Sequence, residues 1–582
     1  MASLANQQEI ADANFLGSLS KVLTIPDKIT WSQFHFFLKG DISGIQDFIF
    51  SVKSRRASRT LKGRSFFIHT LSELCINLIK EKVGVGNVEV FYNGGGNFYL
   101  LLKQEYKHEI DGVRKIINED CGDQEFYVNI SVTKSSDILN SFPEIWKDIH
   151  DVSDRDKLQR YRGYPNGFSP YQRSPITEPI QLDGDDDGGP FSVFARRLVK
   201  SDGWEVRPDE NKPVGIGASG IQFFNNHYRL SGKNGFENIV YELPEWTAGL
   251  KAKYNDLIEG LARKNIHNPE WKRPKVEDII EFEYLAAFAG ERTGTTKLGI
   301  LKMDVDNLGK LFSGRKNAPE AKKVSAAMSW FFGDHLKALL DEPFNEVQFK
   351  DNIYVVFAGG DDCFFLGGWD AVFEFATRLH NRWELFEKTL KGTVKSLPDN
   401  ITLSAGLIMV GPKFPVSRFA HLAEEALGEA KSRETKIGTD KNEERIERKN
   451  AINVFGKTLS WSAFKEAGTT AHNLEDLIKN KGENRAILER LQRESVEFEN
   501  LKTRNSETGI INGRSTWRLL YSVRRTAQEK NLEALTKIAR EYANALVDSF
   551  VKGEPVETPD LHKVPVAARW AEFLTRNSKP KP

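Results

Sequence analysis

The sequence predicts an α+β protein: two ferredoxin-like domains, a mixed connector domain between them and a helical domain after them. The first observation is a repeat, because an apolar stretch broken by acidic residues occurs both at 36–50 (FFLKGDISGIQDFIF) and at 297–312 (KLGILKMDVDNLGKLF). The second is a pair of apolar strands around a tight glycine turn, at 88–102 after the first copy and at 353–368 after the second. Strand, helix, hairpin, helix and strand in that order predict a ferredoxin-like sheet.

The spacing within the two copies matches. Gly94 follows Asp41 by 53 residues, and Gly359 follows Asp304 by 55 residues. A further apolar strand follows each hairpin. A common hairpin turn would explain either glycine cluster alone, but the matched distances favour an internal duplication.

These patterns set the expected domain boundaries. The divisions are a short N-terminal segment at 1–35, a first ferredoxin-like domain at 36–165, a connector at 166–290, a second ferredoxin-like domain at 291–458, and a helical domain at 459–582. The charged segment at 432–448 lies within the fourth of these and is expected to be an exposed loop or a frayed helix.

Composition restricts the class of protein. The 582 residues contain 82 Lys and Arg against 81 Asp and Glu, which excludes a uniformly basic nucleic-acid coat and leaves only local patches for RNA. Three cysteines without C-x-x-C spacing exclude a zinc ribbon and favour a reducing compartment. With no apolar run of about 18 residues and no signal-peptide pattern, we expect a cytoplasmic protein with no membrane contact.

The second copy contains the residues for chemistry. Asp304 ends a strand, and the hairpin tip places Asp361 and Asp362 at the same sheet edge. Clustered carboxylates are unfavourable without a cation, and oxygen-only ligands suit one or two Mg²⁺ or Mn²⁺ ions. Gly359 and Gly360 leave the backbone open to a nucleotide. The alternative is a solvated acidic turn, which the apolar flanking strands disfavour.

These residues resemble a known family. The Gly-Gly-Asp-Asp turn at 359–362, after the Lys-Met-Asp-Val-Asp run at 302–306, resembles the palm domain of nucleotidyl cyclases and GGDEF diguanylate cyclases. The paired palms are similar to the large polymerase-like subunit of type III CRISPR effector complexes, closest to the III-A/D branch. The further motifs that carry this resemblance are Ile42 to Gln46, the basic run from Arg55 to Arg64, Gly94 to Asn97, and Ala423 to Lys431.

The resemblance implies roles in the second palm. It makes Asp304, Asp361 and Asp362 the catalytic metal ligands, with the Val305 backbone carbonyl completing the shell. Asp306 would orient a ligand or a water from outside that shell. Lys431 matches the palm lysine that meets the triphosphate, although a lysine at a helix end also complements the helix dipole.

The first palm is expected to be a nucleotide cradle. Its turn, Gly94-Gly95-Gly96-Asn97, lacks both acids of the second turn. It should therefore hold the second ATP without metal chemistry, with Ser43 near the phosphates or ribose.

The activity implied is an RNA-activated nucleotidyltransferase that joins ATP by 3′–5′ bonds into cyclic oligoadenylates and releases pyrophosphate. The implied partners are guide RNA, target RNA, and the handle-binding and small helical subunits of a type III complex. Three alternatives stay open: another adenosine-bearing acceptor such as S-adenosylmethionine, a silent nucleotide- and RNA-binding scaffold, and a stand-alone dinucleotide cyclase.

The sequence departs from the family in two places. About 35 residues precede the first palm, too few for the family's His-Asp nuclease domain, so no DNase of that type is expected; His150-Asp151 is interpreted as a chance surface pair. The connector has no zinc ribbon and contains the acidic stretch 183–189, which fits only half of an EF-hand loop and is interpreted as a loop without a cation.

A basic run in the first palm is the candidate RNA contact, because densely spaced cations suit phosphate binding. The alternative is a helix start whose cations face water. The residues are Lys53, Arg55, Arg56, Arg59, Lys62 and Arg64.

Overall fold

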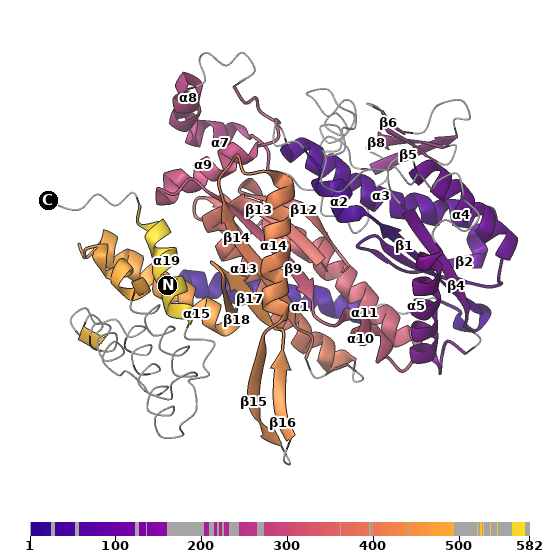
Figure 1. Cartoon of the computed structure of the whole chain (residues 1–582). Coiled ribbons are helices and arrows are strands. Elements are labelled where there is room, and N and C mark those ends of the chain that lie inside the picture. The colour runs from indigo at the N-terminus through magenta and orange to yellow at the C-terminus, as the bar shows by residue number, and fades with distance from the viewer. Residues whose placement is uncertain are drawn as a thin grey trace.

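The computed structural model contains two sheet-and-helix domains side by side, with further helices and a smaller sheet around them (Figure 1). The residues that the structure describes are 2–24, 29–52, 57–122, 127–135, 137–159, 203–208, 215–217, 220–223, 226–231, 244–264, 273–360, 362–394, 397–398, 400–440, 443–493, 562–576 and a few single positions between 521 and 544.

The first palm is a four-stranded antiparallel sheet in the order β2-β3-β1-β4, which is the ferredoxin-like order. Its strands are β1 (Phe36–Ser43), β2 (Val88–Gly94), β3 (Asn97–Leu102) and β4 (Tyr127–Lys134). Its helices are α2 (Ile45–Phe50), α3 (Ala57–Val83), α4 (Lys107–Gly122) and α5 (Phe142–Leu158).

The second palm repeats this order as β12-β13-β9-β14 and adds β17 and β18 beyond β14. Its strands are β9 (Leu298–Val305), β12 (Ile353–Gly359), β13 (Asp362–Gly368), β14 (Leu403–Val410), β17 (Ala451–Val454) and β18 (Lys457–Ser460). Its helices are α9 (Phe282–Thr293), α10 (Leu308–Ser313), α11 (Ala318–Trp330), α12 (Leu336–Leu340), α13 (Trp369–Thr393) and α14 (Val416–Lys431).

The first sheet and the four corresponding strands of the second share their strand order and their register at the glycine turns, which confirms the predicted fold class and the repeat. On the central strand of each, Asp41 lies opposite Asn97, and Asp304 lies opposite Asp362. Each hairpin has a β-bulge that begins four residues before the glycine that ends its first strand. The register and the position of the bulge are the same in both hairpins. The two domains therefore have the same local geometry, as expected for a duplicated unit.

Each palm covers the bulged edge strand of the other. From α3 of the first palm, Lys62 Nζ donates to the Val355 carbonyl at 3.0 Å and Ser65 Oγ donates to the Val356 carbonyl. These carbonyls are on β12, at the bulge, where the register shifts and the ladder is locally disrupted.

The reciprocal contact comes from α11 of the second palm. Lys322 Nζ donates to the carbonyls of Val90 (2.6 Å) and Phe91 (3.0 Å), and Ser325 Oγ donates to Phe91 at 3.2 Å. In each palm, a lysine and a serine three residues apart thus cap the bulged edge strand of the other palm. We call these two contacts the reciprocal clamp.

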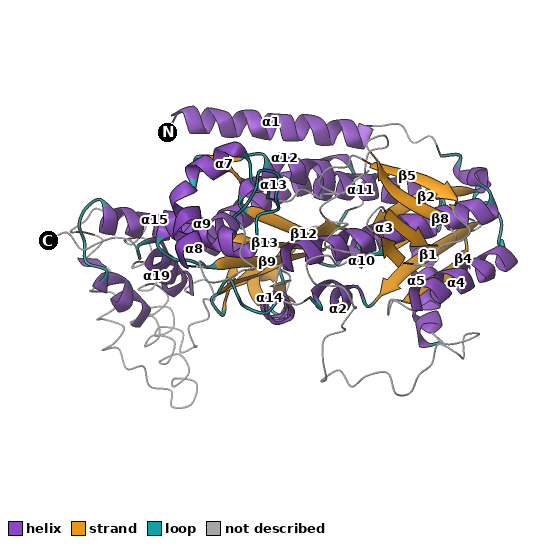
Figure 2. Ribbon diagram, turned by 90° about the horizontal axis from the view of Figure 1, so that it is seen from above, coloured by secondary structure: helices purple, strands orange, loops and turns teal. Residues whose placement is uncertain are grey.

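The remaining described elements surround the palms. Helix α1 (Ala2–Thr24) lies across one side of the molecule, over α11 and α13 (Figure 2), and buries Phe15, Leu19 and Leu23. The connector contributes α7 (Ala248–Lys253), α8 (Asn255–Lys264) and a sheet of β5 (Gly203–Pro208), β6 (Gly215–Gly217), β7 (Gly220–Phe223) and β8 (Asn226–Ser231). Two short strands, β10 (Pro343–Phe344) and β11 (Val347–Gln348), complete the second palm.

The expectation of a loop or frayed helix at 432–448 was wrong. This segment forms the hairpin β15 (Glu434–Asp440) and β16 (Glu443–Arg448), which projects from the second palm (Figure 1). A strand pair this rich in charged residues has no apolar alternation in its sequence to identify it. The acidic stretch 183–189 lies outside the described residues.

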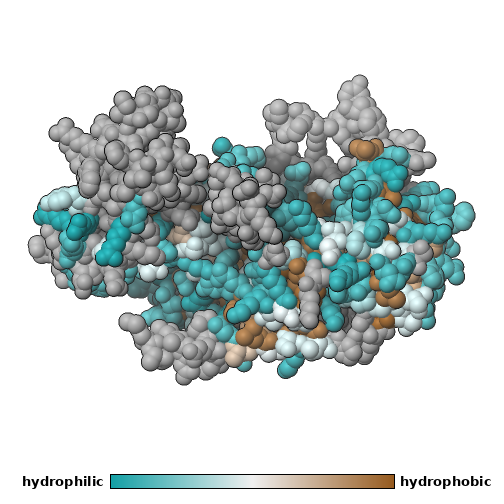
Figure 3. All heavy atoms as spheres, turned by 90° about the horizontal axis from the view of Figure 1, so that it is seen from below, coloured by the Kyte–Doolittle hydropathy of each residue, from teal (hydrophilic) through white to brown (hydrophobic). Residues whose placement is uncertain are grey.

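The last described helices are α15 (Trp461–Lys479) and α19 (Lys563–Leu574), which pack on each other and on the second sheet. On the face shown in Figure 3, the described residues are mainly hydrophilic, with apolar side chains in small patches. Among the described helices, none has both the length and the apolar composition needed to cross a bilayer.

Candidate active site between the palms

Two carboxylates lie opposite each other at the end of the central strand of the second palm. Asp304 on β9 and Asp362 on β13 are direct cross-strand partners, so their Cβ atoms lie about 5 Å apart on one face. Like charges in this arrangement repel each other unless a cation lies between them. The third predicted ligand, Asp361, lies outside the described residues.

A cation from this chain already lies at Asp304. Lys431, the last residue of α14, places Nζ 2.6 Å from Asp304 Oδ2, with the two side chains 32% and 20% exposed. Burial raises the pKa of the Asp304 carboxyl, and the bond from Lys431 opposes that rise only in part. Lys431 thus lies at the site, as the sequence predicted, and occupies the position of a counter-cation.

Asp306 has a different environment. It is 4% exposed and accepts hydrogen bonds from the hydroxyls of Thr402 (2.8 Å) and Ser404 (2.8 and 3.0 Å), and from the Asn450 amide (3.2 Å). These bonds tie the end of β9 to β14 and to the start of β17. Asp306 therefore fixes the strand end on which Asp304 is placed.

The donor set fits a hard divalent cation. Asp304 and Asp362 supply oxygen ligands, and the ammonium of Lys431 shows that positive charge is favoured at this position. Among the described residues no trio of His, Cys, Asp and Glu converges on one point, so a third protein ligand has to come from Asp361 or from a backbone carbonyl such as that of Val305.

The glycine turns of the two palms meet at this site. A Cβ on Gly360 would lie 2.7 Å from the Tyr92 hydroxyl and 3.3 Å from the Gly95 nitrogen, and one on Gly94 would lie 3.1 Å from the Gly360 nitrogen. Gly360 also has a φ of +71°. Both turns need glycine because a side chain on either would push the palms apart.

A cavity of about 150 Å³ lies beside these turns. Gly359 and Asp362 of the second palm line it together with Gly95 and Gly96 of the first. The lining also includes residues that the sequence interpretation did not assign to the site: Gln46, Lys62, Ser65, His69 and Phe357. Ser43, expected near the phosphates, is not among the lining residues, and the helix that follows it contributes Ile45 and Gln46 instead.

A second cavity, of about 510 Å³, lies at the hairpin of the first palm. Its lining uses the positions equivalent to those of the smaller cavity, with Lys322, Ser325 and Ser329 from α11 in place of Lys62, Ser65 and His69 from α3. His69 lines both cavities, so the two adjoin. The two palms therefore line these two cavities with equivalent residues, as they do in the reciprocal clamp.

The first palm also retains an aspartate–lysine pair. Lys157, near the end of α5, places Nζ 2.6 Å from Asp41 Oδ2, and Lys39 lies 3.6 Å from the same oxygen. The opposing residue is Asn97, so a second carboxylate is missing. The sequence interpretation missed Lys157, although its position after β4 is equivalent to that of Lys431 after β14.

The candidate RNA contacts require correction. Lys62 and Arg64 are 2% and 1% exposed; Lys62 belongs to the reciprocal clamp, and Arg64 donates to the carbonyls of Phe48 and Ser51. Arg59 is 3.3 Å from Glu281. These cations hold the chain's own structure, because α3 is enclosed between the palms. Lys53, Arg55 and Arg56 lie outside the described residues.

His150 also differs from the expectation of a surface pair. Its Nε2 is 3.1 Å from the Tyr99 hydroxyl, its Nδ1 is 2.7 Å from the Trp146 carbonyl, and burial lowers its pKa. It is half-buried against Tyr99 and Trp146 of the first palm.

Comparisons with known proteins agree with this architecture. Residues 297–439 match the family model for the second palm domain of Cas10/Cmr2, and residues 34–173 match that for domain B of the Csm1 subunit. Solved Csm1–Csm4 cassettes are similar in fold: the apo form has a TM-score of 0.61 at 18% identity and covers 95% of this chain and 72% of that chain. The complex with cA4 has a TM-score of 0.59 at 18% identity and covers 94% and 72%.

Two curated relatives are described as the single-strand-specific deoxyribonuclease Cas10/Csm1 of subtype III-A CRISPR systems. The protein of Methanocaldococcus jannaschii is 30% identical over 82% of this chain and 65% of its own length, and that of Mycobacterium tuberculosis is 25% identical over 68% and 53%. The chain thus spans about half to two thirds of these relatives. Together with the two family models, the matches show that the chain belongs to the Cas10/Csm1 family, homologous to the type III-A proteins and containing a Cas10 palm domain.

Proposed function

We propose that this chain is an RNA-activated nucleotidyltransferase that joins ATP molecules by 3′–5′ bonds into cyclic oligoadenylates within a type III CRISPR complex. One observation carries the proposal: the paired carboxylates of Asp304 and Asp362, with Lys431 between helix and strand, lie where the glycine turns of two palms meet. Such a site has the ligands for metal-assisted phosphoryl transfer, and it lies where a nucleotide on one palm would face a nucleotide on the other.

In the proposed reaction, the 3′ hydroxyl of one ATP attacks the α-phosphorus of another, and each residue of the site has a separate role. Asp304 and Asp362, with Asp361, would hold Mg²⁺ or Mn²⁺, which supplies charge stabilisation to the transferring phosphoryl group. Lys431 moves from Asp304 to the triphosphate as the donor nucleotide binds. The bare backbone of Gly359 and Gly360 allows that nucleotide to approach closely. Pyrophosphate is the leaving group, and the ammonium of Lys431 balances its negative charge.

The first palm positions the acceptor. Its larger cavity adjoins the smaller one through His69, and its Asp41 is balanced by two lysines of its own. A nucleotide held there needs no metal and gains only orientation, a large contribution when two substrates react.

The smaller cavity supports control by RNA. At about 150 Å³ it lies below the roughly 300–1,000 Å³ of sites that enclose a whole small molecule. It can take part of a nucleotide, and full occupancy requires the two glycine turns to separate. Target RNA paired with the guide would favour that separation, and pairing of the flank with the guide handle would prevent it.

The relatives support this assignment. Solved Csm1–Csm4 cassettes contain ATP, AMPPNP, pppApA and cA4. By analogy, a handle-binding subunit like Csm4, guide RNA and target RNA are the partners we propose for this chain. The curated relatives are described as deoxyribonucleases; a His-Asp nuclease activity of this chain is not part of the proposal.

The test is mass spectrometry of products from the assembled guide complex given target RNA, Mg²⁺ or Mn²⁺, and ATP, with and without S-adenosylmethionine. We expect adenylate rings that disappear in Asp361→Ala/Asp362→Ala while the complex still assembles. A mixed adduct would keep the chemistry and change the acceptor, which the larger cavity of the first palm could accommodate. A complex that yields no product with any substrate would contradict the proposal and favour a scaffold.

A further inference from the structure

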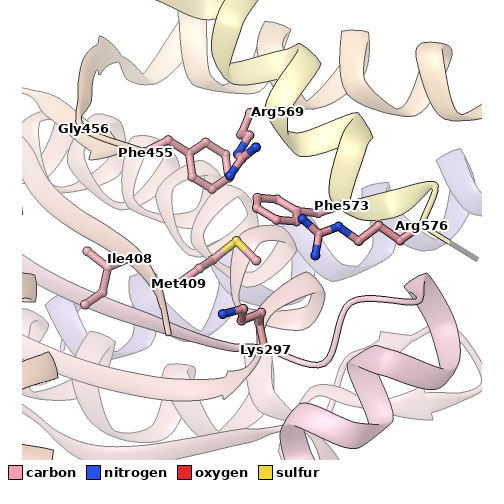
Figure 4. A pocket seen from close by; sticks show the side chains of 8 residues that line it. All are labelled: Lys297, Ile408, Met409, Phe455, Gly456, Arg569, Phe573 and Arg576. Carbon is pink, nitrogen blue, oxygen red and sulfur yellow. The ribbon is translucent and has the colours of Figure 1, made fainter. Parts of the chain in front are cut away.

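A third cavity lies at the opposite end of the second palm from the carboxylates. Its volume is about 530 Å³, within the range of small-molecule sites. Lys297 precedes β9 and Asp304 lies near its end, so the two sites are about 23 Å apart along the strand. The eight lining residues, shown in Figure 4, are Lys297, Ile408, Met409, Phe455, Gly456, Arg569, Phe573 and Arg576.

Three of the eight lining residues are cations and none is an acid. Arg569 lies on α19, Arg576 follows its end, and Lys297 directly precedes β9. Glu572 holds both guanidiniums, at 2.6 Å from Arg569 and 3.3 Å from Arg576. One carboxylate shared by two arginines leaves the cavity with excess positive charge, so it is suited to an anion.

Aromatic rings line the same cavity. The guanidinium carbons of Arg569 and Arg576 lie 4.7 and 4.8 Å from the Phe573 ring centroid, and the Phe455 ring lies 5.7 Å from that of Phe573. Figure 4 shows both rings and Met409 facing the hollow, with the nitrogen atoms of the cations around them. A flat apolar surface beside converging cations is what a base next to its phosphate requires.

The backbone at Phe455 is a second, independent observation. Phe455 and Gly456 form the turn between β17 and β18 with φ of +52° and +73°. Such a turn ordinarily takes Asn-Gly, because a bulky residue is strained at positive φ. The turn therefore keeps an aromatic ring at a position where the backbone disfavours it, and that ring lines the cavity.

We propose that this cavity is a nucleotide-binding site separate from the catalytic one, in which Lys297, Arg569 and Arg576 hold phosphate and the partly exposed ring of Phe455 stacks a base, while Phe573 supports the two guanidiniums. The ligand is a nucleotide, either free or as part of a single strand of RNA. The site joins the second palm to α19, so an occupant would fix the helical domain against the catalytic sheet.

The test uses the full chain without ATP or divalent metal, so its outcome is independent of catalysis. A fluorescent single-stranded RNA octamer containing 5-iodouridine serves as the probe for anisotropy and for ultraviolet cross-linking with peptide mapping. We expect cross-links on the peptides that contain Phe455 or Phe573. Competition by AMP distinguishes the sources: displacement shows that one nucleotide is sufficient, and resistance with intact cross-links shows that a strand is required.

Two variants and one matched control test the assignment. Lys297→Gln/Arg569→Gln/Arg576→Gln should weaken binding at least tenfold and lower the slope of log affinity against log salt by about 0.7 for each phosphate that the protein no longer neutralises. Phe455→Leu keeps an apolar side chain and should also reduce affinity about tenfold by removing the stacking surface. The control, Lys82→Gln/Lys350→Gln/Lys481→Gln, removes three exposed, acid-paired cations elsewhere and should bind like the parent.

The proposal is overturned if the cross-links map only to other peptides, or if the triple variant and its control bind RNA and AMP equally. It is also overturned if a Glu-rich octapeptide binds in place of either nucleic-acid probe, because the cavity would then belong to an acidic protein segment. Thermal unfolding of each variant shows whether a loss of binding is due to a loss of fold. If the triple variant does not fold, the affinity of Phe455→Leu for the RNA probe decides whether the proposal holds.

Discussion

The two palms share a scaffold and differ in how charge is balanced at one strand end. In both, an aspartate lies near the end of the central strand and a lysine from the last helix lies 2.6 Å from it: Lys157 at Asp41 and Lys431 at Asp304. The residue opposite the aspartate is an amide in one palm, Asn97, and an acid in the other. This one difference, Asn97 in the first palm and Asp362 in the second, adds a carboxylate to the strand end of the second palm.

A second difference deepens the first. Lys39 and Lys302 occupy equivalent positions two residues before their aspartates, but Lys39 pairs with Asp41 whereas Lys302 pairs with Glu424. Within the described part of the chain, Asp41 therefore has two lysines and Asp304 has one. On the proposed function, the second palm leaves negative charge available for a metal, whereas the first palm has already neutralised its own.

The largest expected effect is a test of this asymmetry by matched substitutions. Asp304→Asn should lower ATP conversion by the assembled complex roughly 100-fold or more, since it removes a charge that stabilises the transition state. Asp41→Asn should stay within about threefold of the parent. Rates of pyrophosphate release measure both. Equal loss in the two variants would show that the palms are not divided into catalyst and cradle.

The reciprocal clamp predicts unequal stabilities. Lys62→Met should lower the free energy of unfolding by about 2 kcal/mol, since a buried carbonyl loses a charged donor, and Lys322→Met by about 1 kcal/mol because water reaches that contact. Urea denaturation of the chain measures both values, with exposed Lys82→Met as the unaffected control. If Lys322→Met lowered the free energy of unfolding more than Lys62→Met, the Lys322 contact would be the one shielded from water.

Lys431 is expected to have two opposite effects. The Lys431→Met variant has no ammonium at Asp304, so it should bind Mn²⁺ severalfold more tightly. Its KM for ATP should rise about tenfold, because the triphosphate loses a charged donor. Metal titrations of the rate separate the two effects. Lys157→Met is the matched control in the first palm and should change neither; a shift in its metal dependence would place a metal there too.

The smallest effect concerns acid stability of the second palm. His335 is buried beside Trp330, and burial, followed by the charge of Arg382, lowers its pKa to about 3. The unfolded chain takes up a proton near pH 6.5 and the folded chain does not, so this histidine costs about 1 kcal/mol of stability between pH 7 and pH 5.5. His335→Phe should flatten that part of the pH dependence of unfolding, whereas His421→Phe on the surface should not. An unchanged profile in His335→Phe would assign the acid sensitivity to other groups.

Sequence reasoning recovered the parts of the site that lie on regular, repeated elements. The strand order, both glycine turns and the placement of Asp304 and Lys431 followed from apolar strands at matched distances and from the family resemblance. It missed Lys157, whose neighbourhood has no motif, and misassigned Lys62 and Arg64, because a basic run looks the same in sequence whether water or another domain covers it. It also missed the hairpin of β15 and β16, whose sequence has no apolar alternation.

By itself, the sequence determined the duplicated α+β plan and which palm contains the acids, because strand alternation, turn glycines and residue identity are local properties. Only the tertiary structure decided which lysine balances which aspartate and that α3 and α11 each cap an edge strand of the other palm. It also decided that α19 closes a cationic cavity at the opposite end of the second palm from the carboxylates. These are contacts between residues far apart in the chain. Their energy depends on burial and distance, and both are set when the domains pack together.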